Sequence, residues 1–352
     1  METSLFDYPL PPERIAQKPM EPREAAKLLV LDRKTGAVED KHVGDLPSLL
    51  RKGDLLVFND SKVFKARLTA EIYGMHTREA GKKVEIFLLR PEGSLWLALA
   101  RPGKKLHVGC RVMFADGSKA RIMGKRDDGT VDIDFGIHPD RVFDLADQFG
   151  EVPVPPYVEP TAENTSVYQT TYAKNVGSVA APTAGFHFTN ALLETIRNNG
   201  IETAFVTLHV GVGTFRPMKS ETLEEHDMHE EWAQVPEETA VMIQKAKQEG
   251  RRVIVVGTTA MRALESWAKV QEIKPELLGK NGEWSGFTNL FITPGFEFKV
   301  ADGLITNFHL PKSTLIVLVS SFAGREQVMH AYQHAIENDY RFYSFGDTML
   351  IT

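Results

Sequence analysis

The sequence predicts a mixed α/β fold, in which an antiparallel β-barrel domain is inserted into a discontinuous α/β domain. Its 352 residues suit two domains, or one large domain with an insertion. Short alternating segments without helical periodicity fill residues 67–153, which is typical of a small antiparallel barrel or sandwich. Strands alternate with helices beyond them, which favours a largely parallel sheet with helices packed on it. We therefore expect residues 1–66 and 154–352 to form the α/β domain and residues 67–153 to form the inserted barrel.

The first part of the α/β domain contains two apolar segments, residues 28–34 and 54–58, which predict buried strands. A short helix that ends near Lys52 and Gly53 is expected to join them. Turns rich in Gly, Pro and Asp then separate five alternating segments that predict the strands of the barrel. These segments are residues 84–89, 95–100, 111–114, 119–123 and 130–135. The proline-rich residues 152–157 predict a stiff linker back into the α/β domain.

Beyond the linker, residues 190–199 predict a helix, because Thr189 is a good N-cap and Gly200 a good stop. The elements expected after it are a strand at 204–210, a helix between Pro236 and Gly250, a strand at 252–256, a helix at 260–269, strands at 304–308 and 314–320, a helix at 325–337 and a last strand within 340–351. This alternation of strands and helices is the pattern of a parallel sheet.

The composition is that of an ordinary globular protein, with 42% hydrophobic and 25% charged residues. A single cysteine, Cys110, excludes an internal disulfide and a thiolate metal cluster, and it suits a reducing cytoplasm. The N-terminal residues show no signal peptide, and the apolar run at 315–319 is too short to span a membrane. We therefore expect a cytoplasmic monomer without a membrane partner.

The charge of the chain is distributed unevenly. The net charge is −6, yet residues 62–126 hold fifteen Lys and Arg against five Asp and Glu, a balance of +10 that leaves −16 for the rest. A basic segment in an acidic protein is the pattern expected for contact with a phosphate backbone. The alternative is the solvated surface of a small β domain, which is the more common origin of basic runs. The size of the asymmetry favours a polyanionic partner.

Three histidines lie in stretches of small residues, at 177–189, 207–217 and 305–313, where backbone can approach a ligand closely. They are His187, His209 and His309. One histidine beside a strand is usually a packing or capping residue, but three in matching surroundings, with Arg216 nearby in sequence, favour a shared small-molecule site. Imidazole can serve there as general acid or base, and Arg216 as a fixed cation for a carboxylate or phosphate.

Residues 255–259 form a strand-to-helix turn that ends in Gly257, Thr258 and Thr259. Backbone N–H groups and two hydroxyls at the start of a helix, which also carries Arg262, suit a ligand with polar or anionic groups. The motif is neither GxGxxG nor a P-loop, so it implies neither a dinucleotide nor a triphosphate. The same Gly and Thr would also serve a purely structural turn.

Two further motifs have both a structural and a functional interpretation. His226 and His229 lie three residues apart beside carboxylates, a spacing that puts both rings on one face of a helix. No HExxH signature accompanies them, so we expect a solvated or site-edge loop and no metal. Residues 59–61 are typical of a turn. The cations that follow them, Lys62, Lys65 and Arg67, lie at the junction of the expected domains, where they could bind a polyanion.

Over nearly its full length the chain resembles the S-adenosylmethionine:tRNA ribosyltransferase-isomerase family. The segments that carry the resemblance are Pro12–Gln17 with Pro19, Gly53–Asp60, Pro155–Tyr157 with Tyr168–Thr170, Gly177–Thr189, Thr207–Pro217, Met228–Trp232, Gly257–Ser266, Leu304–Thr314 and Tyr340–Ile351. The chain departs from the family pattern in small ways. Ser61-Lys62 and Lys65 stand where the family has Thr-Arg and Pro, and Lys27 replaces an Arg. Lys62 and Lys27 keep the charge of the arginines they replace but lose their bidentate geometry.

The resemblance implies an α/β domain with an inserted barrel, as the pattern of elements also does. It implies that the ribosyl part of S-adenosylmethionine moves to the aminomethyl nitrogen of 7-aminomethyl-7-deazaguanine at the tRNA wobble position. The ribosyl group becomes an epoxycyclopentanediol, as in epoxyqueuosine, and adenine and methionine are released. S-adenosylmethionine is then a co-substrate, and neither a metal nor a redox cofactor is implied.

On this basis His187 and His209 are expected to share the acid and base work, Arg216 to hold the methionine carboxylate or a nearby phosphate, and His309 to contact the ribose or the leaving base. The residues expected to bind S-adenosylmethionine are Thr183, Thr214, Thr258, Thr259 and Arg262. Those expected to contact tRNA are Lys62, Lys65, Arg67, Lys82, Lys83, Lys104 and Lys105. The alternatives are a metal hydrolase centred on His226 and His229, and a non-catalytic RNA-binding protein.

Overall fold

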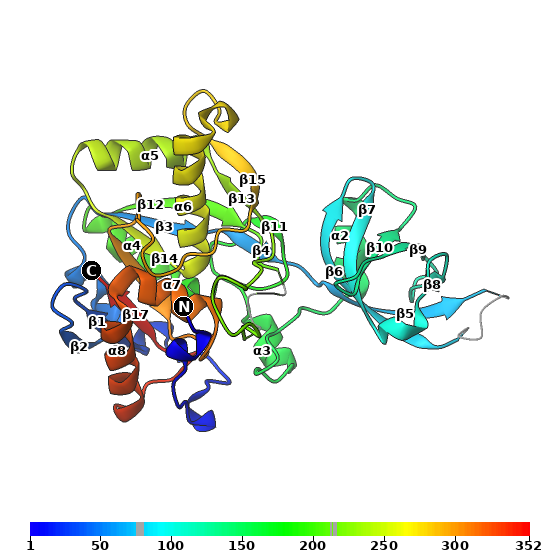
Figure 1. Cartoon of the computed structure of the whole chain (residues 1–352), viewed down its shortest axis with the longest axis horizontal. Helices are drawn as coiled ribbons and strands as arrows, with labels where there is room; N and C mark the ends of the chain where they lie inside the picture. The colour runs from blue at the N-terminus through cyan, green and yellow to red at the C-terminus, as the bar shows by residue number, and fades with distance from the viewer. Residues whose placement is uncertain (75–80, 212, 214–216) are drawn as a thin grey trace. The chain divides into compact units, whose positions relative to one another are not determined.

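The computed structural model describes residues 1–74, 81–211, 213 and 217–352. It divides the chain into two compact units (Figure 1). The first consists of Met1–Lys62, Pro155–Asn175 and Ala181–Thr352, and the second of Val63–Val154 with Val176–Ala180. A nine-stranded mixed sheet lies in the first unit and a closed six-stranded antiparallel barrel in the second. The expected mixed α/β fold with an antiparallel barrel is therefore confirmed.

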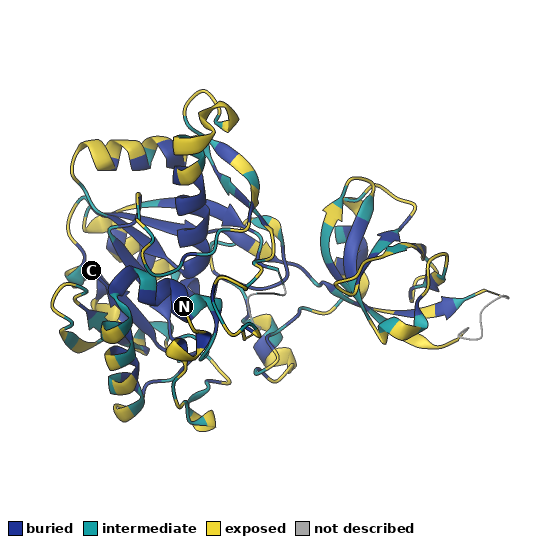
Figure 2. Cartoon of the chain, viewed as in Figure 1, coloured by how far each residue is buried: buried dark blue, intermediate teal, exposed yellow. Residues whose placement is uncertain are grey.

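The sheet has the strand order β15-β13-β12-β3-β14-β16-β17-β1-β2. Its centre consists of four parallel neighbours, β12 (Glu202–Leu208), β3 (Leu55–Asn59), β14 (Val253–Val256) and β16 (Gly303–Asn307). The strands that flank them are β15 (Trp284–Thr288), β13 (Glu231–Val235), β17 (Thr348–Ile351), β1 (Lys27–Leu31) and β2 (Val38–His42). Every residue of β3, β14 and β16 is buried, as Figure 2 shows in dark blue. Because the central strands are parallel, their carboxyl ends share one edge.

Helices complete the first unit on both faces of the sheet. α4 (Asn190–Asn198) packs Leu192, Leu193 and Ile196 into the core that includes β3 and β14, beside the short α1 (Leu46–Leu49). The Thr189 side chain accepts a hydrogen bond from the Leu192 backbone N–H at 3.2 Å, so the predicted cap is confirmed. The other helices are α3 (Ala162–Ser166), α5 (Glu237–Gln248), α6 (Thr258–Ile273), α7 (Thr314–Ala323) and α8 (Arg325–Glu337). None in the described part of the chain is long and apolar enough to cross a membrane.

The strand expected at 314–320 is wrong, because this segment is the helix α7. Its run of Leu, Ile and Val is typical of a buried strand, but the Ser313 hydroxyl caps a helix by accepting from the Ile316 backbone N–H at 3.3 Å. A helix that is apolar on nearly all sides is stable when it is buried all round, as α7 largely is. The strands β2, β13 and β15 were not predicted; β2 carries the polar sequence Val-Glu-Asp-Lys-His.

The barrel has the strand order β10-β7-β6-β5-β8-β9. Its strands are β5 (Arg67–Tyr73), β6 (Lys83–Glu92), β7 (Leu95–Arg101), β8 (Arg111–Met113), β9 (Lys119–Lys125) and β10 (Thr130–Asp134). All but β5 were predicted, within a few residues at their ends. α2 (Arg141–Phe149), which was not predicted, places Phe143 against Phe64 and Trp96, with ring centroids 5.0 Å apart in both pairs. Alternating burial along β5 and β9 leaves every second side chain on the surface.

Candidate functional site

The carboxyl ends of β3 and β12 and the start of α6, which follows β14, are joined by one buried side chain, Asn59 at the end of β3. Its amide donates to the Leu208 carbonyl at the end of β12 and to the Thr259 hydroxyl at the start of α6, both at 3.0 Å. Its carbonyl oxygen accepts from the backbone N–H groups of Leu208 and Ser61, also at 3.0 Å. All four interactions hold the edge in one arrangement. Sequence reasoning treated Asn59 only as turn chemistry; its position directly after a buried strand was the available signal.

His209 directly follows β12 and is fixed on two sides. Its Nδ1 lies 2.8 Å from the Ser61 hydroxyl, and its ring stacks on Trp232 with centroids 5.1 Å apart. Burial lowers the pKa of His209 to about 4. The imidazole is therefore neutral at neutral pH, as a proton acceptor must be.

His309 follows β16 on the same edge. Its Nε2 lies 2.9 Å from the Thr306 hydroxyl, its backbone N–H donates to the Tyr332 hydroxyl at 3.0 Å, and the Tyr8 hydroxyl donates to its carbonyl. Burial lowers the pKa of His309 to about 3. This ring is also neutral and held in place.

A small cavity of about 60 Å³ opens at this edge. Thr183, Thr258, Thr259 and His309, all predicted from sequence, line it together. The Thr183 hydroxyl donates to the Asn307 side chain at 2.9 Å, and Gly257 enters α6 with φ 91°, a conformation that favours glycine. The first backbone N–H groups of the 16-residue helix α6 therefore border the cavity, as a polar or anionic ligand group requires.

A larger cavity of about 320 Å³ lies beside the first, because Leu315 lines both. Arg262 on α6 lines it, and so do His226 and His229. The His226 ring packs against Phe291, with centroids 5.3 Å apart. Among the residues that the structure describes, no group of three or more His, Cys, Asp or Glu is placed to hold a metal.

His187 occupies a different place from the other two histidines. It ends the 3-10 helix η6 (Thr183–His187), it is 6% exposed, and its Nε2 has no hydrogen-bond partner among the described residues. Burial lowers its pKa to about 4, and the charges of Arg341 and Arg23 act in the same direction. The described residues that line the two cavities include neither His187 nor His209. Arg216 and Thr214 lie outside the described residues.

The predicted tRNA contacts are mostly exposed side chains. Lys62 lies on β4 (Ser61–Val63), Lys82 and Lys83 lie at the start of β6, and Lys104 and Lys105 form part of the 3-10 helix η5 (Gly103–Lys105). Lys65 and Arg67 have partners within the second unit. Lys65 donates to the Asp147 carbonyl, and Arg67 pairs with Glu85 at 2.9 Å.

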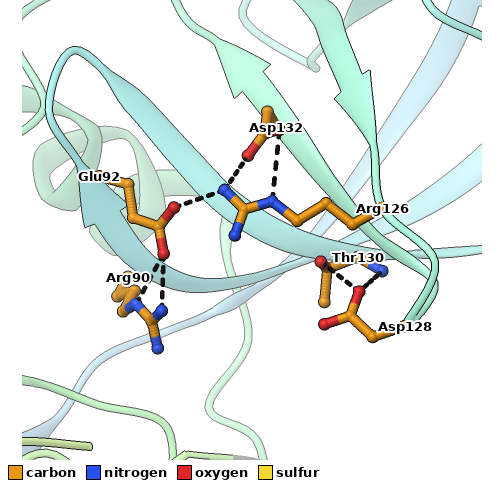
Figure 3. Close-up of polar contacts among 6 residues, drawn as sticks. All are labelled: Arg90, Glu92, Arg126, Asp128, Thr130 and Asp132. Atoms are coloured by element: carbon orange, nitrogen blue, oxygen red, sulfur yellow. Dashed lines mark hydrogen bonds and ion pairs between the residues drawn. The ribbon is translucent and has the colours of Figure 1, made fainter. Parts of the chain in front are cut away.

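The second unit as a whole is much less basic than residues 62–126. The second unit contains fifteen Lys and Arg and thirteen Asp and Glu, a balance of only +2, because it includes the acidic residues that follow Arg126. Figure 3 shows the result at Arg126, whose Nη2 lies 2.5 Å from the carboxylates of both Glu92 and Asp132. Glu92 also accepts from Arg90 at 2.6 Å. These arginines are neutralised by their neighbours.

On a second surface of the barrel the cations are not paired with carboxylates of the described residues. This surface was not predicted from the sequence. Arg111 on β8 and Arg121 on β9 are directly opposite in the strand register, both exposed. Lys119 lies 5.4 Å from the ring centre of Tyr73, which is itself opposite Arg111. None of these three cations has an ion-pair partner within the described part of the chain. Like charges directly opposite each other destabilise a sheet, although Asp134 on β10 also lies opposite Arg121. The three cations give this β8–β9 surface a net positive charge, which is suited to an anionic partner. Alternating cations in the predicted strands were the available signal.

Fold and site together define a class of protein: an α/β domain with two cavities at the carboxyl edge of its parallel strands, combined with a barrel that carries a basic surface. Residues 3–351 match the family described as queuosine biosynthesis protein, and the chain belongs to this family. Among solved structures it is similar to the S-adenosylmethionine tRNA ribosyltransferase from Thermotoga maritima. The two are 38% identical with a TM-score of 0.57, over 99% of this chain and 100% of the other. The family resemblance predicted from the sequence is therefore confirmed, and it places the protein in queuosine biosynthesis.

Proposed function

We propose that the protein transfers and isomerises the ribosyl moiety of S-adenosylmethionine onto 7-aminomethyl-7-deazaguanine at the wobble position of tRNA. The products are epoxyqueuosine-tRNA, adenine and methionine. The observation that carries the proposal is the full-length similarity to a S-adenosylmethionine tRNA ribosyltransferase, combined with two adjoining cavities beside a neutral histidine at the sheet edge. The proposed reaction uses neither a metal nor a redox cofactor.

The reaction needs three proton transfers that this edge is suited to handle. A base removes a proton from the carbon next to the sulfonium, an acid protonates the departing adenine, and the attacking amine loses its proton. Three bonds form: one joins that nitrogen to a ribosyl carbon, one joins two ribosyl carbons to close the cyclopentane ring, and one C–O bond closes the epoxide. Three bonds break: the bond from the ribosyl group to adenine, the bond to the methionine sulfur, and one C–O bond of the ribose ring. His209 is a suitable base because it is neutral and because Ser61 fixes its ring. We propose that His187 shares this work, an assignment that rests on sequence alone; neither His187 nor His209 lines either cavity.

The donor would bind across the two cavities. Thr183, Thr258 and Thr259 offer hydroxyls, and the start of α6 offers backbone N–H groups, to its nucleoside part. His309 would contact the ribose or the leaving base from the same cavity. We also propose that the protein acts as a monomer.

The tRNA would bind through cations of the barrel and of β4, including Lys62, Lys82, Lys83, Lys104 and Lys105, together with Lys65 and Arg67. The β8–β9 surface supports this proposal, because its three exposed cations have no described ion-pair partner. Phosphate contacts of this kind give affinity without reading sequence. With tRNA as substrate and a single cysteine, Cys110, we also propose that the protein acts in the cytoplasm.

One experiment tests the function against its alternatives. The protein is mixed with labelled S-adenosylmethionine and tRNA that carries the deazaguanine precursor, and free adenine and methionine are measured, with tRNA that lacks the precursor as control. We expect both products only with the precursor. Binding of tRNA without release of adenine would indicate a non-catalytic RNA-binding protein, and activity abolished by a chelator would favour the metal hydrolase at His226 and His229.

A further inference from the structure

The guanidinium of Arg262 has one unsatisfied nitrogen. Its side chain is 5% exposed. Its Nε donates to the Leu290 carbonyl at 3.0 Å, and its Nη1 pairs with the buried carboxylate of Glu231. Its Nη2 has no hydrogen-bond partner among the described residues. Leaving a buried charged donor unpaired is unfavourable, so this nitrogen indicates a missing acceptor.

The cavity beside Arg262 is the larger of the two, and much of its wall is apolar. The apolar side chains that line it are Met228, Leu290, Phe291, Ile292, Leu315 and Leu318. A pocket of about 320 Å³ with apolar walls and one guanidinium suits a short apolar chain that ends in a carboxylate.

The charges of the cavity favour a zwitterion over a simple carboxylate. Glu231 already neutralises Arg262 and also accepts from the Gly211 backbone N–H at 2.8 Å. A second carboxylate on Arg262 would therefore need a compensating cation. Glu225 lines the same cavity and has no ion-pair partner within the described residues, so it could receive an ammonium group.

We propose that this cavity binds the α-amino-acid end of the sulfonium donor, with the carboxylate on Nη2 of Arg262 and the ammonium toward Glu225. The inference rests on the proposed function and deepens it, because it assigns one part of the donor to one cavity. Leu315 separates this cavity from the smaller one, where the threonines and His309 lie. The methionine released by the reaction would leave from the same place.

The test compares ligands that differ only by the carboxylate. Binding of S-adenosylmethionine and of decarboxylated S-adenosylmethionine is measured by calorimetry on the wild-type protein, which avoids any effect of a substitution on folding. We expect the decarboxylated donor to bind at least about tenfold more weakly, as loss of a charge-assisted hydrogen bond implies. In Arg262→Lys, which keeps the charge but lacks the second nitrogen, the difference is expected to fall to about threefold or less. Lys219→Ala is the matched control, because Lys219 lines the same cavity as an exposed cation.

The outcomes separate this inference from the proposed function. Equal binding of the two donors by a protein that releases adenine would overturn the inference and leave the function intact. Binding of L-methionine that depends on Arg262, without any adenine release from S-adenosylmethionine, would support the cavity assignment and refute the function. A carboxylate effect that disappears in Lys219→Ala instead would move the contact to Lys219 and also overturn the inference.

Discussion

The carboxyl edge of the sheet and the surface of the barrel hold their titratable groups in opposite ways. At the edge, His209 and His309 are buried enough to stay neutral, and each has a ring nitrogen fixed by a hydroxyl. On the barrel, Arg126 and Arg90 are exposed or half-buried and share the carboxylate of Glu92 (Figure 3). The edge is suited to the transfer of single protons, and the surface of the barrel is suited to attracting an extended anionic partner. Single substitutions should therefore have large effects at the edge and small effects on the barrel.

The largest expected effect of this difference is a loss of stability in acid. Burial holds the pKa values of His187, His209 and His309 at about 4, 4 and 3, below the ordinary 6.5. Between pH 6.5 and about 4 the unfolded chain binds protons that the folded chain does not, so the free energy of unfolding falls as the pH falls. Each imidazole contributes about 3 kcal/mol over that window.

Urea unfolding at a series of pH values measures this slope. In His309→Gln the number of protons taken up on unfolding should drop by nearly one between pH 6 and pH 4. Asp60 and Glu265 have raised pKa values because they are buried, and they change the slope in the other direction, so the comparison with His309→Gln isolates the histidine. An unchanged slope in that variant would contradict the neutral, buried state of His309.

The next effect is on turnover. His209→Ala and His187→Ala are each expected to lower turnover by about two orders of magnitude or more, because a general acid or base contributes about 100-fold or more. Adenine release with saturating tRNA measures it, and circular dichroism checks the fold. Ser61→Ala, which removes the partner of His209 Nδ1, should give a smaller loss. Full activity in both histidine variants would refute the proton-transfer assignment, and a loss confined to His209→Ala would remove His187 from it.

The two regions also differ in how far the sequence predicts them. The order of most strands and helices follows from local patterns. Thr183 and His309, from the small-residue stretches, and Thr258 and Thr259, from the turn at 255–259, line one cavity. The prediction of a strand at 314–320 was wrong because burial of α7 outweighs the strand preference of Ile and Val. The separation of His187 from the cavities depends on long-range packing that no local pattern contains.

The surface charge of the barrel likewise depends on long-range packing that no local sequence pattern contains. Counting residues 62–126 predicted a strongly basic segment, but the fold brings Asp132 and Glu92 onto Arg126. Which cations stay unpaired depends on strand register, and the register places Arg111 opposite Arg121. A sum of charges along the sequence cannot distinguish cations that are paired with carboxylates from cations that face one another.

The exposed arginines of the β8–β9 surface are expected to contribute to tRNA binding. The double variant Arg111→Glu with Arg121→Glu should raise the KM for tRNA by about tenfold and reduce the slope of log affinity against log salt by about 1.5, since each phosphate contact contributes about 0.7–0.9. The KM for S-adenosylmethionine should not change. Salt-dependent binding of tRNA and steady-state kinetics measure both quantities. Reversal of three of Lys82, Lys83, Lys104 and Lys105 provides the comparison, and an unchanged slope in either variant removes that group of cations from the tRNA contact.

The smallest effect is expected at Arg126, the matched control for the β8–β9 surface. Arg126→Ala removes a cation from the same barrel, but one whose guanidinium already lies against Glu92 and Asp132 and is 40% exposed. Such surface pairs contribute about 0–1 kcal/mol to stability, so the unfolding midpoint should move little. The salt slope of tRNA binding should not change, and the affinity should fall by about twofold at most, because the two carboxylates lose their partner and repel phosphate weakly through the solvent. A loss of affinity equal to that of the Arg111 and Arg121 double variant would show that net charge alone, rather than unpaired charge at one surface, determines tRNA binding.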